Sequence, residues 1–527
     1  MASVASRPTA FRRMPSFPTG RGAVILPAAI LFFLVVVSLF LRTRALGDSL
    51  WMDEGLSIGI ASQPFWHIPT TLQVDGSPPL YYMLLAVWMK IFGDGPGETQ
   101  GLSVLIAVAA VPAGMWAGWS LFGRRAGLIC AALCAVNPFL TTYAQETRMY
   151  SLMLLLSLIT TALFLHVFAF GRRNYLPAFA IGLALMLYTH NWGLFLAAAA
   201  VVALYPTWRA SADRKALRRD VLLGFGGAFL LYLPWIPTLI HQALHTGAPW
   251  LDPPRFGAPV QISKSLLGGG TPTVALLLAG GSGIAAILTK RVEDKERLAI
   301  ITAGTLCIAT LAIAWLVSQV SPAWTTRYLG VVLGQLLLIG ALGLARAGYL
   351  GLVAFVIVIG VWSIPKTYGL KNKSNADDLG RAVKQRNLLH RGDLVLSMQP
   401  EQTPLLRYNL PGGLIYGTPL GRVHNPSVMN WTDGQDRLIA ATPAKNLEPL
   451  LARLPRSGRV LIVHPVTTDA SDWDAPWTQL VRRRAAQWGA VLASDKHFRK
   501  VGVVPQFYRR ATRIGVRGVL YEKITSG

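Results

Sequence analysis

Charged residues are scarce in this sequence, and their scarcity excludes an ordinary soluble protein. Only 14% of the 527 residues are charged, whereas 52% are hydrophobic. Soluble domains carry about 25% charged residues. A membrane-spanning helix needs roughly 20 consecutive, mostly apolar residues, and stretches such as 23–41 and 300–320 meet that requirement. The composition therefore predicts a polytopic α-helical membrane protein.

The chain has only three cysteines, and they suggest neither a disulfide framework nor a cysteine-based zinc site. All three, Cys130, Cys134 and Cys307, lie inside apolar runs. Cys130 and Cys134 are four residues apart and share one face of a helix, so a metal-binding pair is the alternative to packing. Small packing residues are the favoured interpretation. No signal peptide is expected, because the first apolar run is long and lacks a small-residue cleavage site.

Acidic residues are half as numerous as basic ones: the sequence has 25 of the former and 50 of the latter, which gives a formal net charge of +25. In a soluble protein such an excess would point to nucleic acid. Here much of it lies in short loops between apolar runs, which is typical of topology control and of contact with anionic lipid headgroups. We therefore expect membrane lipids among the partners, and no nucleic acid.

The basic loops predict eleven spans with the N-terminus in the cytoplasm of an inner or plasma membrane. The tail 1–22 carries four arginines and stays inside by the positive-inside rule. Alternation of the spans then places four further basic loops inside: 124–125, 172–173, 207–220 and 290–298. The eleven apolar runs are 23–41, 101–121, 126–142, 151–170, 175–188, 191–206, 221–240, 272–289, 299–320, 327–345 and 347–364.

One apolar stretch, 79–92, is left out of this count. It is short, follows Pro78, and carries Lys90 with two tyrosines and a tryptophan, which are features of the membrane interface. We expect an amphipathic helix on the outer surface, inside a first outer loop that covers 42–100. Counting it as a span would reverse the side of every later loop.

The sequence predicts three parts: the cytoplasmic tail 1–22, a transmembrane catalytic domain 23–365 and an extracytoplasmic domain 366–527. The last part is polar, with short apolar runs such as 393–397 and 459–463 and a helical pattern at 376–389. Short buried strands that alternate with helices indicate a small α/β domain. Its basic cluster 482–484 is expected to contact anionic lipid, and a role in binding the acceptor stays open.

The first outer segment carries Trp51, Asp53 and Glu54 near its start. Adjacent carboxylates beside the membrane are costly unless they are solvated or used, so they indicate a general base or a metal ligand. The alternative is a structural role, since Asp53 or Ser49 could be the N-cap of a helix. Asp75, in the run Asp-Gly-Ser-Pro-Pro, lies in the same segment, and its alternative is a simple turn.

Three more groups fall on the same predicted face. Arg148, with Glu146 and Tyr150 around it, could hold a phosphate, because arginine donates two parallel hydrogen bonds. The alternatives are a salt bridge between Glu146 and Arg148, or simple anchoring. His190 lies between two short spans, and packing is the alternative for it. Arg327 and Tyr328 open a later span, where Arg327 is a second candidate for the phosphate and snorkelling to the headgroups is its alternative. Phosphate-binding arginines beside carboxylates imply a substrate with an anionic head and a lipid tail.

These motifs, in this order, resemble the membrane glycosyltransferases of the GT-C class. The branch shared by protein O-mannosyltransferases, the aminoarabinose transferases of lipid A and bacterial "mannosyltransferase" proteins is the most similar. The resemblance covers about residues 20–365. It rests on Trp51-x-Asp53-Glu54, on Asp75-Gly-Ser-Pro-Pro-Leu-Tyr-Tyr82, on Asn137-Pro-Phe139 and on Gln145-Glu-x-Arg-Met-Tyr150.

The resemblance implies the GT-C fold and a polyprenyl-monophosphate-linked sugar donor. It implies that Asp53 acts as base with support from Glu54, and that Arg148 and Arg327 bind the donor phosphate. Some relatives have an aspartate just after this arginine. This chain has Tyr150 there, which leaves Asp75 or Glu146 as candidates for the second catalytic carboxylate. Further residues expected around the pocket are Trp51, Tyr82, His190 and Tyr328.

The expected reaction is transfer of a hexose or pentose to an acceptor hydroxyl with inversion, outside the membrane. The acceptor would be a cell-envelope glycan, a lipid or a protein. No cofactor is expected, and a divalent metal has no support in the sequence. A flippase for polyprenyl-phosphate sugars and a non-catalytic assembly protein are the competing functions. A carrier would place its charged groups near mid-membrane, often with internal repeats, and neither pattern is present.

Overall fold

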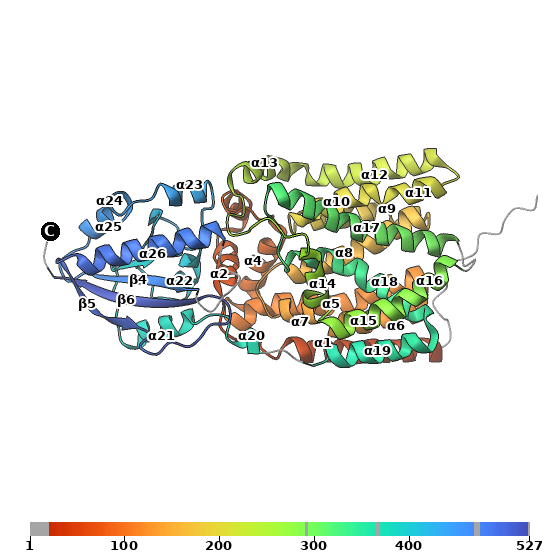
Figure 1. Cartoon of the computed structure of the whole chain (residues 1–527), viewed down its shortest axis with the longest axis horizontal. Helices are drawn as coiled ribbons and strands as arrows, with labels where there is room; N and C mark the ends of the chain where they lie inside the picture. The colour runs from red at the N-terminus through yellow and green to blue at the C-terminus, as the bar shows by residue number, and fades with distance from the viewer. Residues whose placement is uncertain (1–20, 290–293, 365–367, 468–474, 525–527) are drawn as a thin grey trace, which may run out of the picture.

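The computed structural model describes residues 21–289, 294–364, 368–467 and 475–524. It consists of a long helical body and an α/β domain that covers one end of it (Figure 1). The predicted tail 1–22 lies almost wholly outside the described residues. The helical body begins with α1 (Arg21–Arg42) and ends with α19 (Gly348–Trp362).

Eight helices of the described part are long and apolar enough to cross a membrane. The remaining three predicted spans coincide with shorter helices, namely α6 (Arg124–Val136), α9 (Leu176–Leu187) and α19. The number eleven therefore stays a prediction, while the polytopic helical fold is confirmed. The eight candidates are Ile25–Arg42, Pro96–Phe122, Tyr150–Ala169, Trp192–Ala210, Arg214–His245, Gly270–Thr289, Asp294–Val320 and Tyr328–Arg346.

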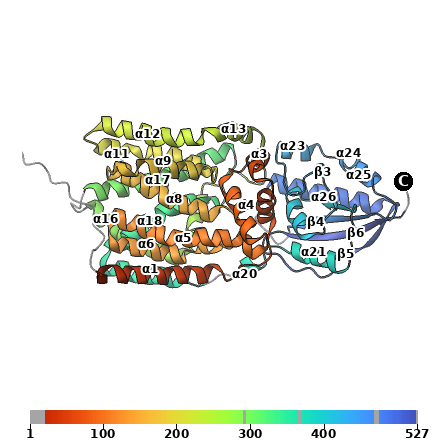
Figure 2. The same cartoon turned by 180° about the vertical axis from the view of Figure 1, so that it is seen from behind.

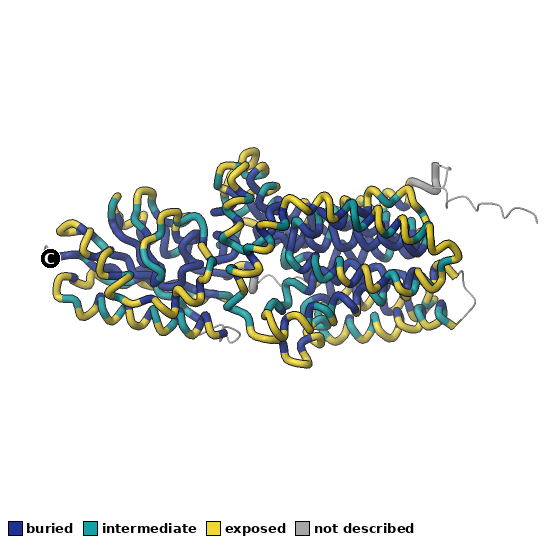
Figure 3. Tube along the Cα trace, turned by 90° about the horizontal axis from the view of Figure 1, so that it is seen from above, coloured by how far each residue is buried: buried dark blue, intermediate teal, exposed yellow. Residues whose placement is uncertain are grey.

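The outward faces of the helical body are apolar. Phe32 is 70% exposed, Leu230 67% and Ile308 70%, and the buried residues lie in the centre of the body (Figure 3). Exposed apolar side chains of this size on helices of spanning length indicate contact with lipid. Helix α12 (Arg214–Tyr232) begins at the end of the body opposite the α/β domain (Figure 2), and its start carries one of the basic loops.

Short helices of the first outer segment lie between the body and the domain. They are α2 (Met52–Ala61), α3 (Ile68–Leu72) and α4 (Leu80–Phe92) (Figures 1 and 2). The 13-residue helix α4 coincides with the stretch that the span count leaves out, and Tyr81 is buried on one of its faces. Its exposed side chains include Leu84, Val87 and Ile91, so the exposed part is largely apolar and does not show the polar face of an amphipathic helix. Its place on the outer membrane surface stays a prediction.

The C-terminal domain is built on a six-stranded sheet in the order β3-β2-β1-β4-β6-β5. Strands β1 (Leu394–Ser397), β2 (Ile415–Thr418) and β4 (Arg459–Val466) are parallel, and β3 (Gly421–Val423), β5 (Phe498–Val504) and β6 (Gly515–Lys523) extend the sheet antiparallel. Helices α21 (Ala376–Gln385) and α22 (Thr403–Asn409) pack on one face of the sheet, and α26 (Pro476–Ser494) packs on the other. The predicted α/β domain is confirmed.

Helix α2 is held tightly between the two parts. A Cβ atom on Gly55 would lie 2.8 Å from Leu405 Cα of α22, and one on Gly59 would lie 1.9 Å from the Ser427 carbonyl oxygen. Because real Cβ atoms do not approach so closely, glycine is required at both positions for the domain to dock. The position of α2, and of the acidic residues at its start, is therefore set by the C-terminal domain as much as by the helical body.

Candidate functional site

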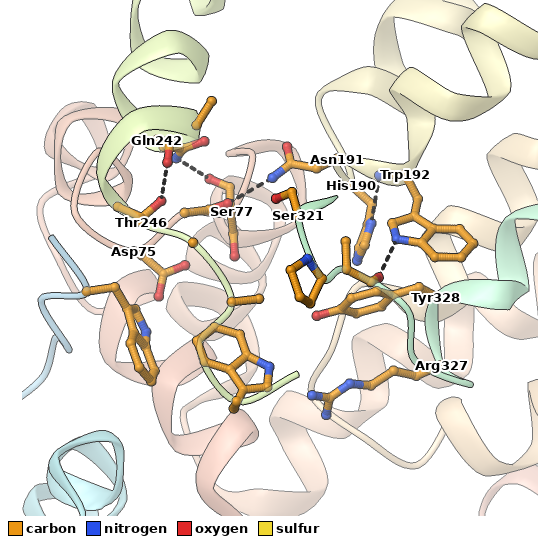
Figure 4. Close-up of a pocket in the computed structure, with 18 of the residues that line it drawn as sticks. Asp75, Ser77, His190, Asn191, Trp192, Gln242, Thr246, Ser321, Arg327 and Tyr328 are labelled. Atoms are coloured by element: carbon orange, nitrogen blue, oxygen red, sulfur yellow. Dashed lines mark hydrogen bonds between the residues drawn. The ribbon is translucent and has the colours of Figure 1, made fainter. Parts of the chain in front are cut away.

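A cavity of about 390 Å³ lies where the helical body, the first outer segment and the C-terminal domain meet. Figure 4 shows Asp75 and Arg327 approaching it from different elements. Six of the residues predicted from the sequence line this cavity: Asp53, Asp75, Arg148, His190, Arg327 and Tyr328. The other five, Trp51, Glu54, Tyr82, Glu146 and Tyr150, do not line it.

Asp53 lies between two arginines at the start of α2. Its Oδ2 is 2.6 Å from Nη1 of Arg327 and 4.0 Å from Nε of Arg148. Arg148 Nη1 also donates to the Asp53 carbonyl oxygen at 3.3 Å and to Ser57 Oγ at 3.2 Å. Residues separated by 95 and 274 positions in the chain are thus brought to one carboxylate.

Both arginines keep a buried donor without a partner. In the described part of the chain, neither Nε of Arg148 nor Nε of Arg327 has a hydrogen-bond partner. A buried N–H group that lacks a partner costs free energy of the order of 1–3 kcal/mol. Two such donors beside one cavity are suited to an anion with several acceptor oxygens, such as a phosphate.

Asp75 faces the same cavity from a loop that is fixed at several points. Gly76 adopts a φ of +95°, and a Cβ there would lie 2.8 Å from Thr246 Oγ1, so glycine is required. Asn191 donates to the Gly76 carbonyl oxygen at 2.9 Å, and Gln242 donates to that of Ser77 at 3.2 Å. Burial raises the pKa of Asp75, and the Asp53 carboxylate adds to this, although Ser77 and Arg148 act in the opposite direction.

His190 is a buried, neutral part of the cavity wall. Its Nδ1 accepts a hydrogen bond from the Trp192 backbone N–H at 3.1 Å, and its ring packs on that of Tyr328 with 4.5 Å between centroids. Burial, with Arg148 and Arg327 nearby, lowers the pKa of His190 to about 3. The imidazole therefore carries no charge at neutral pH.

Glu54 is turned away from the cavity, in contrast to its neighbour Asp53. It is fully buried and forms an ion pair with Lys373 at 2.6 Å. Its carboxylate also accepts from the backbone N–H groups of Thr147 at 2.9 Å and Trp51 at 3.2 Å. Trp51 occupies the N-cap position of α2, so neither Asp53 nor Ser49 is the helix cap that the sequence offered as an alternative.

Glu146 belongs to the same buried layer. It pairs with Arg513 of the C-terminal domain, not with Arg148, so the suggested salt bridge between Glu146 and Arg148 is wrong. The Arg513 guanidinium lies 4.0 Å from the Trp51 ring centroid. We call the two pairs Glu54–Lys373 and Glu146–Arg513, together with Trp51, the domain seam.

Tyr82 and Tyr150 are buried behind the cavity wall, and neither hydroxyl has a hydrogen-bond partner among the described residues. The Tyr150 ring lies 6.2 Å from that of Tyr328 and 5.7 Å from the Arg148 guanidinium carbon. Burial raises the pKa of Tyr82. These tyrosines therefore support the residues that line the cavity from behind.

Sequence reasoning missed the contribution of the C-terminal domain and of one loop. Glu401 and Trp431 of that domain, and Trp250 in the loop after α13 (Ile236–His245), also line the cavity. None of them belongs to a recognisable motif. The position of Glu401 in the sequence could have indicated its role. It follows a predicted buried strand, and ligands of α/β sheets bind at the carboxyl ends of parallel strands.

No group of three or more His, Cys, Asp or Glu residues that could hold a metal ion occurs in the described part of the chain. Cys130, Cys134 and Cys307 are buried and not disulfide-bonded. The charged side chains that line the cavity are the three carboxylates of Asp53, Asp75 and Glu401 and the two guanidinium groups of Arg148 and Arg327.

Comparison with known proteins gives structural neighbours only. No protein-family profile and no curated protein matches this sequence. ArnT from Cupriavidus metallidurans, solved in the apo state and bound to undecaprenyl phosphate, aligns with a TM-score of 0.56 at 14% identity, over 96% of this chain and 98% or 99% of ArnT.

Two further neighbours share the fold of this chain over part of their own length. The oligosaccharyltransferase AglB from Archaeoglobus fulgidus, in complex with an inhibitory peptide and a dolichol-phosphate, aligns with a TM-score of 0.53 at 12% identity over 84% of this chain and 70% of its own. The mycobacterial arabinofuranosyltransferase AftD gives 0.53 at 13% identity, over 95% of this chain and 40% of its own. This chain is therefore a multi-pass membrane protein with the GT-C fold.

Proposed function

We propose that the protein is an inverting glycosyltransferase that moves a sugar from a polyprenyl-monophosphate donor to an acceptor hydroxyl. The observation that carries this proposal is the pair of buried, unpartnered Nε donors on Arg148 and Arg327, beside the Asp53 carboxylate in one cavity. The likeness to ArnT and AglB, whose structures contain undecaprenyl phosphate and a dolichol-phosphate, supports a lipid phosphate as the anion.

The lining of the cavity fits a lipid-linked donor. Apolar side chains from helices of spanning length, including Phe195, Leu239 and Val317, form one part of it, and the two arginines form another. A polyprenyl chain would run along the apolar part and place its phosphate at the guanidinium groups. As the bond to the sugar breaks, the phosphate gains negative charge, which two preorganised arginines stabilise.

Transfer also needs a base for the acceptor hydroxyl. We assign this role to Asp53, because it lies directly beside the phosphate-binding groups, where the hydroxyl must approach the anomeric carbon. Asp75 has no salt-bridge partner among the described residues, and we assign it the role of orienting the hydroxyl. Direct displacement of the lipid phosphate by the acceptor inverts the anomeric configuration.

The position of the charged groups disfavours a carrier. A flippase would need its charged residues near mid-membrane. The cavity is instead lined by residues of α2 and of the C-terminal domain, and these two parts meet at one end of the helical body (Figure 1). A non-catalytic assembly protein would bind a lipid phosphate without transferring the sugar, so the assay below separates it from the transferase.

The reaction is tested with purified protein and a panel of radiolabelled polyprenyl-phosphate sugars that covers mannose, glucose, galactose and arabinofuranose. We expect cleavage or transfer with at least one donor, and a loss of about 10²-fold or more in Asp53→Asn. Arg214→Gln is the matched control, because Arg214 is exposed on the opposite end of the body. If Asp53→Asn is as active as the parent, the assigned base is wrong.

The cavity is proposed to face the outside of the cell, with the N-terminus inside. Single cysteines at Gln73 and Arg214, both exposed, in a background without the native cysteines, test this. A membrane-impermeant thiol reagent should label the two positions from opposite sides. Labelling from the same side would overturn the proposed topology but not the proposed reaction.

A further inference from the structure

The C-terminal domain presents the carboxyl edge of its parallel strands to the cavity. Strand β1 ends at Ser397, and the following turn η8 (Pro400–Gln402) carries Glu401 into the lining. This edge is where α/β sheets bind ligands. The domain therefore contributes binding residues to the cavity in addition to covering it.

Glu401 is a buried carboxylate that is only half satisfied. Its side chain is almost fully enclosed, and Oε1 accepts from Gln399 Nε2 at 2.8 Å and from Trp477 Nε1 at 2.9 Å. Its Oε2 has no hydrogen-bond partner in the described part of the chain. Burial raises the pKa of Glu401, although the bonds from Gln399 and Trp477 oppose this. Leaving such an oxygen unpaired is costly, so a ligand that donates a hydrogen bond there would relieve the cost.

Two indole rings line the cavity near this carboxylate. The Trp250 and Trp431 centroids lie 4.5 Å apart, and Trp431 packs at 5.2 Å on Trp477, the residue that holds Glu401. The Trp431 backbone N–H donates to the Val74 carbonyl oxygen at 2.8 Å, so this aromatic pair is tied to the loop that carries Asp75. The indole Nε1 of Trp250 is a buried donor without a partner among the described residues.

An unpaired acceptor, an unpaired donor and two indole rings in one wall match a particular ligand chemistry. A saccharide ring has hydroxyls that both donate and accept, and an apolar C–H face that packs on aromatic rings. Sites of this kind place a few polar groups within a mostly aromatic and apolar lining to fix orientation.

We propose that Glu401, Trp431 and Trp250 form a saccharide subsite that the C-terminal domain and the loop after α13 add to the cavity. This inference rests on the proposed function, since it takes the lipid phosphate to bind at Arg148 and Arg327. The ring bound here belongs either to the donor or to the acceptor, and both present the same hydroxyl chemistry.

The test compares two ligands on the full-length protein in detergent micelles. Binding is measured for bare undecaprenyl phosphate and for undecaprenyl phosphate that carries each sugar of the panel. The ratio of the two affinities is the gain that the sugar provides. Glu401→Gln keeps an oxygen for Gln399 and Trp477 and changes only the unpaired position, while Trp431→Phe keeps an aromatic ring if Trp431→Ala fails to fold. Glu448→Gln, an exposed carboxylate of the same domain, is the matched control.

If the subsite holds the donor sugar, Glu401→Gln lowers the gain about tenfold and leaves the affinity for bare undecaprenyl phosphate unchanged. If it holds the acceptor ring, the gain is unchanged, but binding of free methyl glycosides to the protein loaded with bare undecaprenyl phosphate falls by a similar factor. The proposal is overturned if Glu401→Gln and the Trp431 variants match the parent in both measurements. A parent that does not bind bare undecaprenyl phosphate, or an Arg327→Gln variant that binds it equally well, would instead refute the proposed function.

Discussion

Asp53 and Glu54 are neighbours on α2, yet they belong to two regions that use charge in opposite ways. In the domain seam, Glu54 has Lys373 and two backbone N–H groups around it. In the cavity, Asp53 lies beside Arg327 and Arg148, and the Nε–H group of each arginine has no hydrogen-bond partner among the described residues. The comparison separates charges that hold the two parts of the protein together from charges that remain available for a ligand.

Substitution of an arginine that lines the cavity should give the largest loss of activity. Arg148→Gln removes a buried guanidinium that faces the cavity, and removal of one such electrostatic group costs about 10²–10³ in turnover. We expect a loss of this size in the donor-cleavage assay, with the protein still folded. A variant with parental turnover would show that Arg148 only anchors α2 through Asp53 and Ser57.

Substitution of a charged residue in the domain seam should instead give the largest loss of stability. Lys373→Met leaves Glu54 as a buried, uncompensated charge, and breaking a buried pair in this way costs about 3–5 kcal/mol. The thermal midpoint in detergent should fall, and the double variant Glu54→Gln/Lys373→Met should recover much of it. A single variant as stable as the parent would contradict the assignment of the seam.

The contrast also explains which parts of the structure the sequence could predict. The spans, the α/β domain and helix α4 depend on local hydropathy and periodicity, which can be read along the chain. The ion pair Glu54–Lys373 joins residues 319 positions apart, and no local pattern predicts such a pair. The motifs identified the cavity residues that lie in the resembling part of the chain, whereas Glu401 and Trp431 lie outside it.

Asp75 should show a smaller, pH-dependent effect. Its pKa is raised above the ordinary value of 3.8, so the folded protein binds a proton at this site that the unfolded chain has already lost. Its contribution to stability is therefore lost as pH rises from the ordinary value through the raised pKa. Asp75→Asn removes this dependence.

The thermal midpoint of the parent should accordingly fall relative to that of Asp75→Asn as pH rises through this window. The difference between the two proteins isolates Asp75 from other carboxylates with raised pKa values, such as Glu146 and Glu401. A constant difference across the window would mean that Asp75 is solvated in the folded protein.

Two arginines on the same tryptophan allow the most direct test of the comparison. The Arg327 guanidinium lies 5.7 Å from the Trp51 ring centroid on the cavity side, and that of Arg513 lies 4.0 Å from it in the seam. The measurement is the affinity of the purified protein for undecaprenyl phosphate in Arg327→Gln and Arg513→Gln. We predict that Arg327→Gln weakens binding by about tenfold or more, whereas Arg513→Gln lowers the thermal midpoint and leaves the affinity of the folded fraction at the parental value. Equal affinities in the parent and in Arg327→Gln would contradict the central claim that the cavity arginines bind a lipid phosphate.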